Sequence, residues 1–202
     1  MDRKRATLTG LAAILLWSTM VGLIRSVSEG LGPVGGAAMI YTVSGLLCLV
    51  TVGFPDLRRF STRYLIAGSI LFVSYEMCLA LSLGYAATRS QAIEVGMVNY
   101  LWPSLTIAFA ILFNGQKTTL WVIPGLLISL LGVCWVLGGE NGLQLNDIMQ
   151  NVVSSPLSYG LAFAGAFIWA AYCTVTSKYA KGQNGITLFV LLTALSLWVK
   201  YA

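Results

Sequence analysis

Uncharged, mainly apolar stretches recur along the chain and are separated by short segments that carry most of the charge. An α-helix needs ~20 such residues to cross the hydrocarbon core of a bilayer. The stretches that are long enough predict seven spans, at about residues 6–24, 33–53, 64–86, 94–113, 119–138, 157–177 and 185–202. The pattern therefore predicts an all-α polytopic membrane protein, and the longest connection, 139–156, is predicted to be an extramembrane loop.

Composition excludes a soluble globule and argues against catalysis. Hydrophobic residues make up 57% of the chain and charged residues 9%, whereas a soluble domain has about 25% charged residues. The chain has no histidine, which is the commonest general base. The four cysteines fall inside predicted spans without metal-like spacing. We therefore expect no enzyme activity, no cofactor and no metal.

The basic residues gather on one side of the predicted membrane. Nine of the twelve fall there, namely Arg3, Lys4, Arg5, Arg58, Arg59, Arg63, Lys117, Lys178 and Lys181. Lys and Arg in short loops stay cytoplasmic, so the N-terminus is predicted to be inside and the 139–156 loop outside. The net charge of +5 is explained by this topology, and we expect no nucleic-acid partner.

A weak internal repeat relates the first and sixth spans. The matching positions are Gly10, Ala13 and Trp17 in one and Ala162, Gly165 and Trp169 in the other. Five spans separate the two starts, so the second copy would enter the membrane from the opposite face, as in inverted-repeat transporters. We predict a first five-span repeat at 1–152 and the start of a second at 153–202. It would be a truncated part of a five-plus-five bundle; chance similarity and a natural seven-span chain are the alternatives.

Glu76 lies in the middle of the third predicted span. A charged side chain there costs ~2.5–3.5 kcal/mol on insertion scales and marks a path for a polar substrate or ion. It either binds a substrate ammonium, carries a proton, or stays neutral and hydrogen-bonded within the bundle. Glu94, at the start of the next span and near Arg89, is expected to stabilise the helix N-terminus.

The fourth span combines polar groups with a proline. Asn99, Trp102 and Thr106 share one helical face, and Pro103 cannot donate to the carbonyl of Asn99. Such groups should face the protein interior or a watery cavity. Tyr100 would wall the same cavity or pack on a neighbour. The alternative is a kink that local hydrogen bonds repair.

Three further aromatic residues lie deep in their predicted spans rather than at the interfaces. They are Trp17, Trp169 and Tyr172. A buried indole N–H needs a hydrogen-bond partner, which is either a polar substrate in a cavity or another helix. We interpret these residues as cavity lining.

Several segments together resemble a known family. They are LWSTMVG at 16–22, SYEMCLALSLG at 74–84, AIEVGMVNYLWPSLTIAFAILF at 92–113 and PGLLISLLGVCWVLG at 124–138. The chain is similar to the EamA type of the drug/metabolite transporter superfamily, in particular to its exporters of aromatic amino acids. The resemblance implies a ten-span protein of the bacterial inner membrane, whose two inverted halves enclose a central cavity.

The resemblance also implies substrates and site residues. Export of phenylalanine, tyrosine and tryptophan by alternating access is the expected function, and efflux of flat cations such as methyl viologen is the alternative. By resemblance, Trp17, Tyr75, Glu76, Tyr100, Trp102 and Trp169 lie on the substrate pathway. With Asn99 and Tyr172 they form the predicted substrate-binding set. The expected partners are aromatic amino acids and the lipid bilayer, and passive and proton-coupled transport both stay open.

Overall fold

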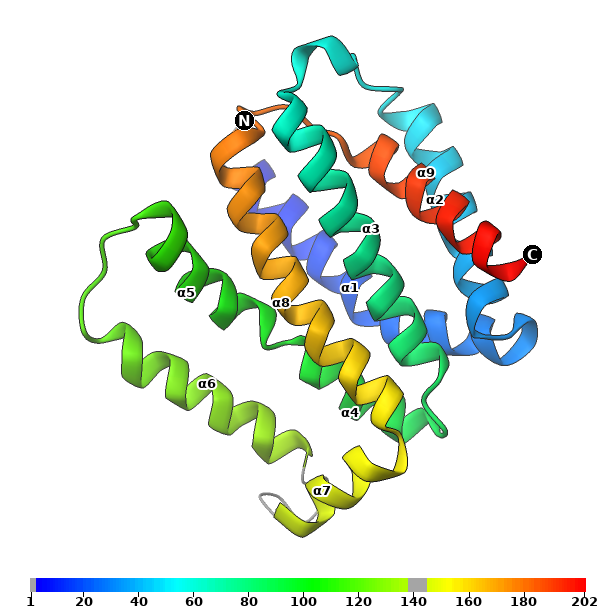
Figure 1. Ribbon diagram of the computed structural model, residues 1–202, viewed down its shortest axis with the longest axis vertical. Helices are drawn as coiled ribbons and strands as arrows, with labels where there is room; N and C mark the ends of the chain where they lie inside the picture. The colour runs from blue at the N-terminus through cyan, green and yellow to red at the C-terminus, as the bar shows by residue number, and fades with distance from the viewer. Residues whose placement is uncertain (1–2, 138–144) are drawn as a thin grey trace.

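The computed structural model describes residues 3–137 and 145–202, and their regular structure is helical (Figure 1). The helices are α1 (Arg3–Leu31), α2 (Pro33–Thr51), α3 (Thr62–Gly84), α4 (Arg89–Asn99), α5 (Trp102–Asn114), α6 (Val122–Leu137), α7 (Leu145–Ser154), α8 (Pro156–Tyr179) and α9 (Ile186–Tyr201), with a single 3₁₀ turn at Leu57–Arg59. Five stretches are long and apolar enough to cross a membrane: Lys4–Leu31, Pro33–Thr51, Thr62–Gly84, Arg89–Asn114 and Pro156–Tyr179. Two more apolar helices, Val122–Trp135 and Ile186–Tyr201, are shorter. The prediction of a multi-pass helical membrane protein is confirmed.

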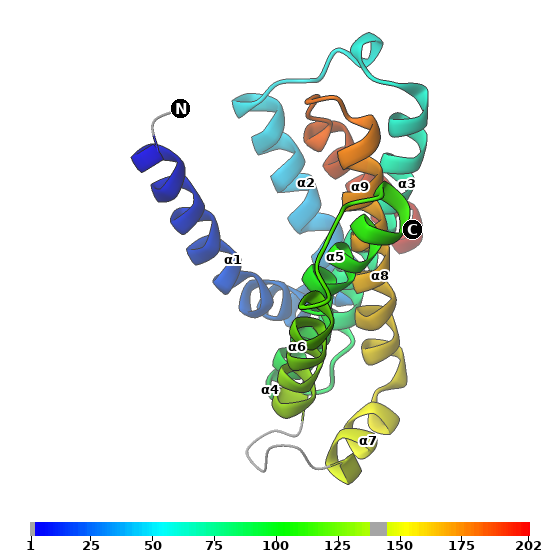
Figure 2. The same ribbon diagram turned by 90° about the vertical axis from the view of Figure 1, so that its left-hand side faces the viewer.

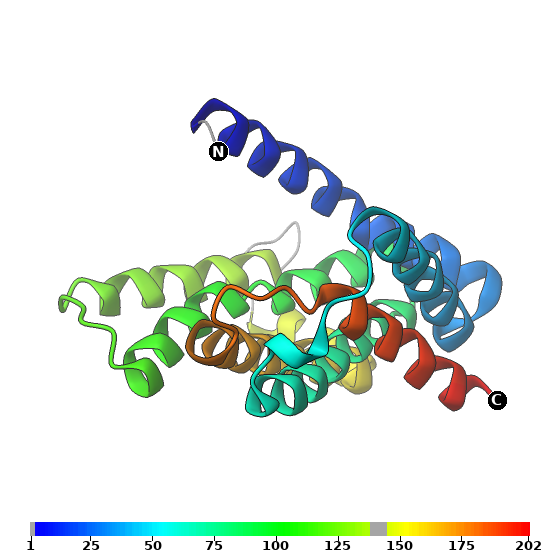
Figure 3. The same ribbon diagram turned by 90° about the horizontal axis from the view of Figure 1, so that it is seen from above.

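Helices α3 and α8 lie side by side at the centre and run in opposite directions (Figure 1). The antiparallel pair α2 and α9 packs beside α3, and α5 packs against the other side of α8. Helix α1 contacts α2, α3 and α4, and its N-terminal half diverges from the other helices (Figures 2 and 3). Residues 4–19 of α1 are all exposed.

Small residues let the helices approach closely where α1 turns into α2. A Cβ added at Gly36 would lie 3.0 Å from the Cα of Ser28. Another added at Gly84 would lie 3.0 Å from the Cα of Pro33. Small residues at helix contacts are typical of membrane bundles. These contacts join α1, α2 and α3 at one end of the bundle.

Two predicted boundaries are corrected by the structure. The first span extends to Leu31 rather than residue 24, since Arg25 and Glu29 pair along the helix at 3.2 Å and do not end it. The predicted span 94–113 is two helices, because the chain leaves the helical path between Asn99 and Trp102. Pro103, which cannot donate a backbone hydrogen bond, falls in the first turn of α5, where none is needed.

The predicted loop 139–156 is also wrong in part, because residues 145–154 form α7. This segment is amphipathic: Met149 and Val153 are exposed, while Asn151 and Ser154 bond to other residues. Ten residues are too few to span a bilayer, so α7 is consistent with an extramembrane connection that contains a short helix. Glu140 lies outside the described residues, as does the side chain of Asp147.

The basic segments that flank α3 and α8 meet at one end of the bundle. The Ser61 hydroxyl donates to the Tyr179 carbonyl at 3.2 Å, and the Arg63 guanidinium lies 6.0 Å from the Tyr179 ring centroid. Lys178 lies at the same end, 5.7 Å from that ring. The sequence places these residues on one side of the membrane, and their meeting at one end agrees with that prediction.

The glycine contact between α1 and α2 yields a stability prediction. We expect Gly36→Ala to destabilise the protein by about 1–3 kcal/mol, because its methyl group would press on the backbone of Ser28. Gly132→Ala in α6 is the matched control, since its Cβ meets nothing within 4 Å and the change raises helix propensity. Thermal unfolding in detergent measures both. Equal or higher stability of Gly36→Ala would contradict the packing.

Candidate functional site

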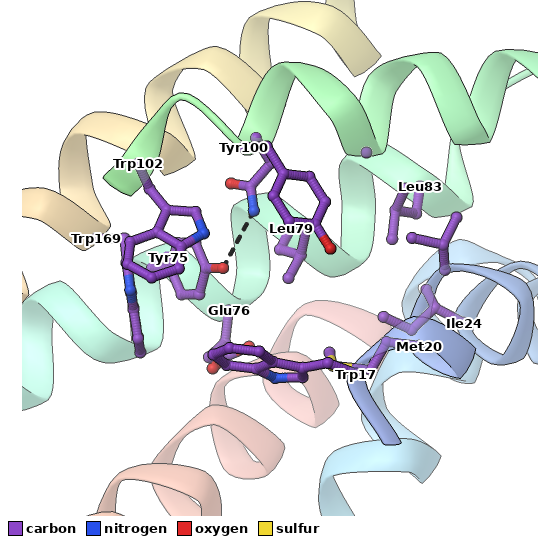
Figure 4. Close-up of a pocket in the computed structure, with 13 residues that line it drawn as sticks. Trp17, Met20, Ile24, Tyr75, Glu76, Leu79, Leu83, Tyr100, Trp102 and Trp169 are labelled. Atoms are coloured by element: carbon purple, nitrogen blue, oxygen red, sulfur yellow. Dashed lines mark hydrogen bonds between the residues drawn. The ribbon is translucent and has the colours of Figure 1, made fainter. Parts of the chain in front are cut away.

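A cavity opens where α1, α3 and α8 face the break between α4 and α5 (Figure 4). Its volume is about 100 Å³, room for a few waters at about 30 Å³ each. Seven of the eight predicted site residues line it: Trp17, Tyr75, Glu76, Asn99, Tyr100, Trp102 and Trp169. Tyr172 does not. Apolar side chains from α1 and α3, among them Met20, Ile24 and Leu79, complete the wall.

Aromatic rings form one side of the cavity. Trp102 lies between two other tryptophans, with its ring centroid 6.4 Å from Trp17 and 6.3 Å from Trp169, both edge to face. The Tyr75 ring lies 4.3 Å from that of Trp169. Rings at such distances and angles attract one another, so the wall has a defined shape that suits a flat apolar ligand.

Tyr172 supports this wall from behind. Its ring lies 4.9 Å from Trp169 and 5.5 Å from Phe72, which is buried. The periodicity correctly places it beside Trp169 on α8. It does not reveal that Tyr172 packs against Phe72 of α3 and lies outside the cavity lining.

Glu76 brings a carboxylate to the cavity without a basic partner. Its Oε2 accepts a hydrogen bond from the Tyr41 hydroxyl of α2. Within 3–137 and 145–202 the ion pairs are Arg25–Glu29, Arg59–Asp56 and Arg89–Glu29, so none neutralises Glu76. A charge in the membrane is stable only when paired or solvated. The arrangement can therefore receive a cation.

Asn99 joins the aromatic wall to the helix break. Its amide nitrogen donates to the Tyr75 hydroxyl at 3.2 Å, as the dashed line in Figure 4 shows. Its Oδ1 is buried and has no hydrogen-bond partner within the described part of the chain. A buried acceptor gains free energy when it is hydrogen-bonded, so this oxygen can accept a hydrogen bond from a donor in the cavity.

The break itself is partly repaired locally, as the kink alternative proposes. The Tyr100 amide donates to the Met97 carbonyl at 3.0 Å, and the Leu101 amide to that of Val98 at 3.1 Å. Thr106, predicted on the same face as Asn99, does not line the cavity. Its hydroxyl donates to the Trp102 carbonyl at 2.7 Å. The break thus exposes Tyr100 and Trp102 to the cavity but not Thr106.

A second polar cluster closes the end of the helices beyond Ile24. The Arg25 guanidinium donates to the carbonyls of Gly84 and Ala86 at the end of α3. Glu29 pairs with both Arg25 and Arg89, at 3.2 and 2.8 Å. The cluster ties α1 to α3 and α4. The predicted first span ends at residue 24, which leaves Arg25 outside the helix, so the sequence does not reveal this cluster.

Glu94, which the sequence places near Arg89, has other partners. Glu94 accepts hydrogen bonds from the amide of Asn151 at 2.9 Å and the hydroxyl of Tyr159 at 2.8 Å. It therefore joins α4 to α7 and α8. This agrees with a structural role, although the contacts are tertiary and the expected neighbour Arg89 pairs with Glu29 instead.

Residues 4–138 match the model of the EamA-like transporter family. The chain belongs to this family. It is thus a transporter rather than an enzyme, and the family resemblance of the sequence is confirmed. No solved structure matches the chain.

Curated relatives agree over the whole chain. It is 77% identical over 201 residues to the aromatic amino acid exporter YddG of Salmonella typhimurium and 74% identical to that of Escherichia coli, covering 100% of this chain and 69% of each relative. A relative of the same name from Ancylobacter novellus is 29% identical over 96% of this chain and 66% of its own length.

The cavity should be wet, and cysteine labelling tests this. In a background with the four native cysteines replaced by alanine, we expect Tyr100→Cys to react at least about tenfold faster with a water-soluble thiosulfonate than Leu195→Cys, because the reactive thiolate forms only in water. The two side chains are similarly exposed, 50% and 60%, but only Tyr100 lines the cavity. Equal rates would mean a dry cavity.

Proposed function

We propose that this chain exports aromatic amino acids through the cavity between α1, α3, α5 and α8. The relatives that it matches at 74–77% identity are named for that activity. The observation that carries the proposal is the Glu76 carboxylate, which has no basic partner among the described residues and faces a wall of three tryptophans.

Each part of an aromatic amino acid has a complementary group in this cavity. The ring would lie against Trp17, Trp102 and Trp169 by apolar burial and edge-to-face contact. The ammonium would approach Glu76, and the unpaired Oδ1 of Asn99 is a second acceptor for its hydrogens. The Tyr100 hydroxyl and the Trp102 indole N–H are donors for the substrate carboxylate. Tyr75 and Tyr172 hold Trp169 in place.

The cavity must widen for such a substrate to pass. Its volume of about 100 Å³ is too small for a whole aromatic amino acid, and α1 contributes Trp17, Met20 and Ile24 to its wall. Movement of α1 would alternately open and close the site, as in transporters that rock about a central site. The Arg25–Glu29–Arg89 cluster would anchor the pivot.

An inverted repeat, with a first five-span copy at 1–152 and the start of a second at 153–202, is part of this proposal. The counterpart helices α2 and α9 pack against each other in opposite directions. Trp17 and Trp169, related by the 152-residue offset, lie on either side of Trp102 at nearly equal distances. Both features are what a two-fold relation through the cavity requires. The N-terminus would be cytoplasmic, as the loop charges indicate, and the membrane would be the bacterial inner membrane, as the resemblance to the exporter family implies.

Export of labelled phenylalanine from loaded cells tests the site. We expect Trp102→Ala and Glu76→Gln to lower the export rate at least about tenfold, or ~1.4 kcal/mol, because one removes the ring contact and the other the charge. Trp135→Phe in α6 is the control, since that residue is 61% exposed and does not line the cavity. Unchanged export by both site variants, at equal expression, would remove their assigned roles.

A flat cation is the second candidate substrate, favoured by the same unpaired acid among aromatic faces, which attract cations. If the cation is the main substrate, we expect excess phenylalanine to slow the export of methyl viologen only slightly. Export of labelled methyl viologen, measured with and without excess phenylalanine, decides. If phenylalanine inhibits methyl viologen export and is itself exported faster than methyl viologen, the amino acid is the main substrate.

A further inference from the structure

Tyr41 touches the site without lining the cavity. It lies on α2, is buried, and packs with Phe72 and Ala80 of α3 and Ala194 of α9. Its hydroxyl donates to Oε2 of Glu76. Glu76 itself lines the cavity, and Tyr41 does not. Tyr41 therefore approaches the carboxylate from within the helix bundle rather than from the cavity.

This contact makes the two oxygens of the Glu76 carboxylate different. Within the described residues, Oε2 has the Tyr41 hydroxyl as a donor and Oε1 has none. A hydrogen bond to an ionised acceptor is stronger than one between neutral groups, so Tyr41 fixes the orientation of the carboxylate. Oε1 is then the oxygen left for a cationic group in the cavity.

Helix α2, which carries Tyr41, packs closely against α9. Gly45, one turn further along, lies so close to α9 that an added Cβ would be 2.6 Å from the side chain of Leu191. The neighbouring hydrogen bond from the Trp198 indole of α9 to the Thr42 hydroxyl, at 2.9 Å, is exposed and lies outside this packed contact. A side chain held by packing on rigid helices positions its partner precisely.

We propose that Tyr41 is a positioning residue for ammonium recognition: its hydroxyl holds the Glu76 carboxylate so that one oxygen faces the ammonium of the substrate. The inference rests on the proposed function for the identity of the substrate. It adds a residue outside the cavity that determines how tightly the cationic end of the ligand is held.

The test measures binding, so it does not depend on transport. The full chain is purified into lipid nanodiscs, and affinity is measured for labelled phenethylamine, which has the ring and the ammonium but no carboxylate. Tyr41→Phe is expected to weaken this binding about tenfold. The affinity for the neutral compound 3-phenylpropanamide is measured by its displacement of the label. Tyr41→Phe is expected to change this affinity less than twofold, because the compound has no positive charge to interact with Glu76.

Two further variants separate positioning from folding. Thr42→Val is the matched control, since it removes the neighbouring α2–α9 hydrogen bond without touching Glu76, and should leave phenethylamine affinity within twofold. In a Glu76→Gln background, Tyr41→Phe should also change affinity less than twofold, because its target is gone. Such loss of effect in the double variant identifies a coupled pair.

The contrary outcomes are distinct. The proposal would be overturned if Tyr41→Phe bound phenethylamine as tightly as the wild type, or if the wild type did not bind it at all. It would also be overturned if Tyr41→Phe caused the same tenfold loss of affinity in the Glu76→Gln background, or if it weakened the binding of both compounds equally. Phenylalanine export is measured in parallel. Tyr41-dependent phenethylamine binding without export would contradict the proposed function and leave the Tyr41–Glu76 assignment intact.

Discussion

The structure depends on how lipid penalises polar groups that have no partner. Such groups are tolerated at membrane depth only inside protein or beside a cavity. Here they converge from several helices on one place: the Glu76 carboxylate of α3, the Asn99 amide of α4 and the chain break before Trp102. Each has a separate partner: Glu76 bonds to Tyr41, Asn99 bonds to Tyr75, and the amides at the break bond to nearby carbonyls. All three border the same cavity, which gives their remaining polar atoms a place to meet water or a substrate.

The helix break shows how one residue organises this arrangement. In an unbroken helix Asn99 and Trp102 would follow the same turn, and Tyr100 would point about a quarter-turn away. Because the chain departs from the helix between Asn99 and Trp102, Tyr100 and Trp102 both reach the cavity. Pro103 makes this break inexpensive, since α5 can begin there without losing a hydrogen bond. The local sequence thus sets the shape of the wall.

Apolar periodicity predicts the membrane helices because this signal is local. Polar and aromatic residues deep in the spans, together with the family resemblance, predict most of the cavity lining, including Glu76 and Trp102. Tyr41 and the Arg25–Glu29–Arg89 cluster were missed because their meaning lies in contacts across 35 to 61 residues of sequence. Nothing near Tyr41 in the sequence distinguishes it from a packing tyrosine. Helix α7 was missed for another reason: a ten-residue amphipathic pattern is ambiguous between an interfacial helix and a loop.

The two ends of α1 contact the rest of the protein differently, which bears on how the cavity could open. Its C-terminal part is held by Arg25 and Glu29, whereas its N-terminal part is exposed and reaches the site through the contact of Trp17 with Trp102. A ligand ring that binds against Trp102 would displace the contact of Trp17 with that ring. Because ligand and Trp17 would compete for the same aromatic face, occupancy and opening of the cavity would be coupled by a single indole.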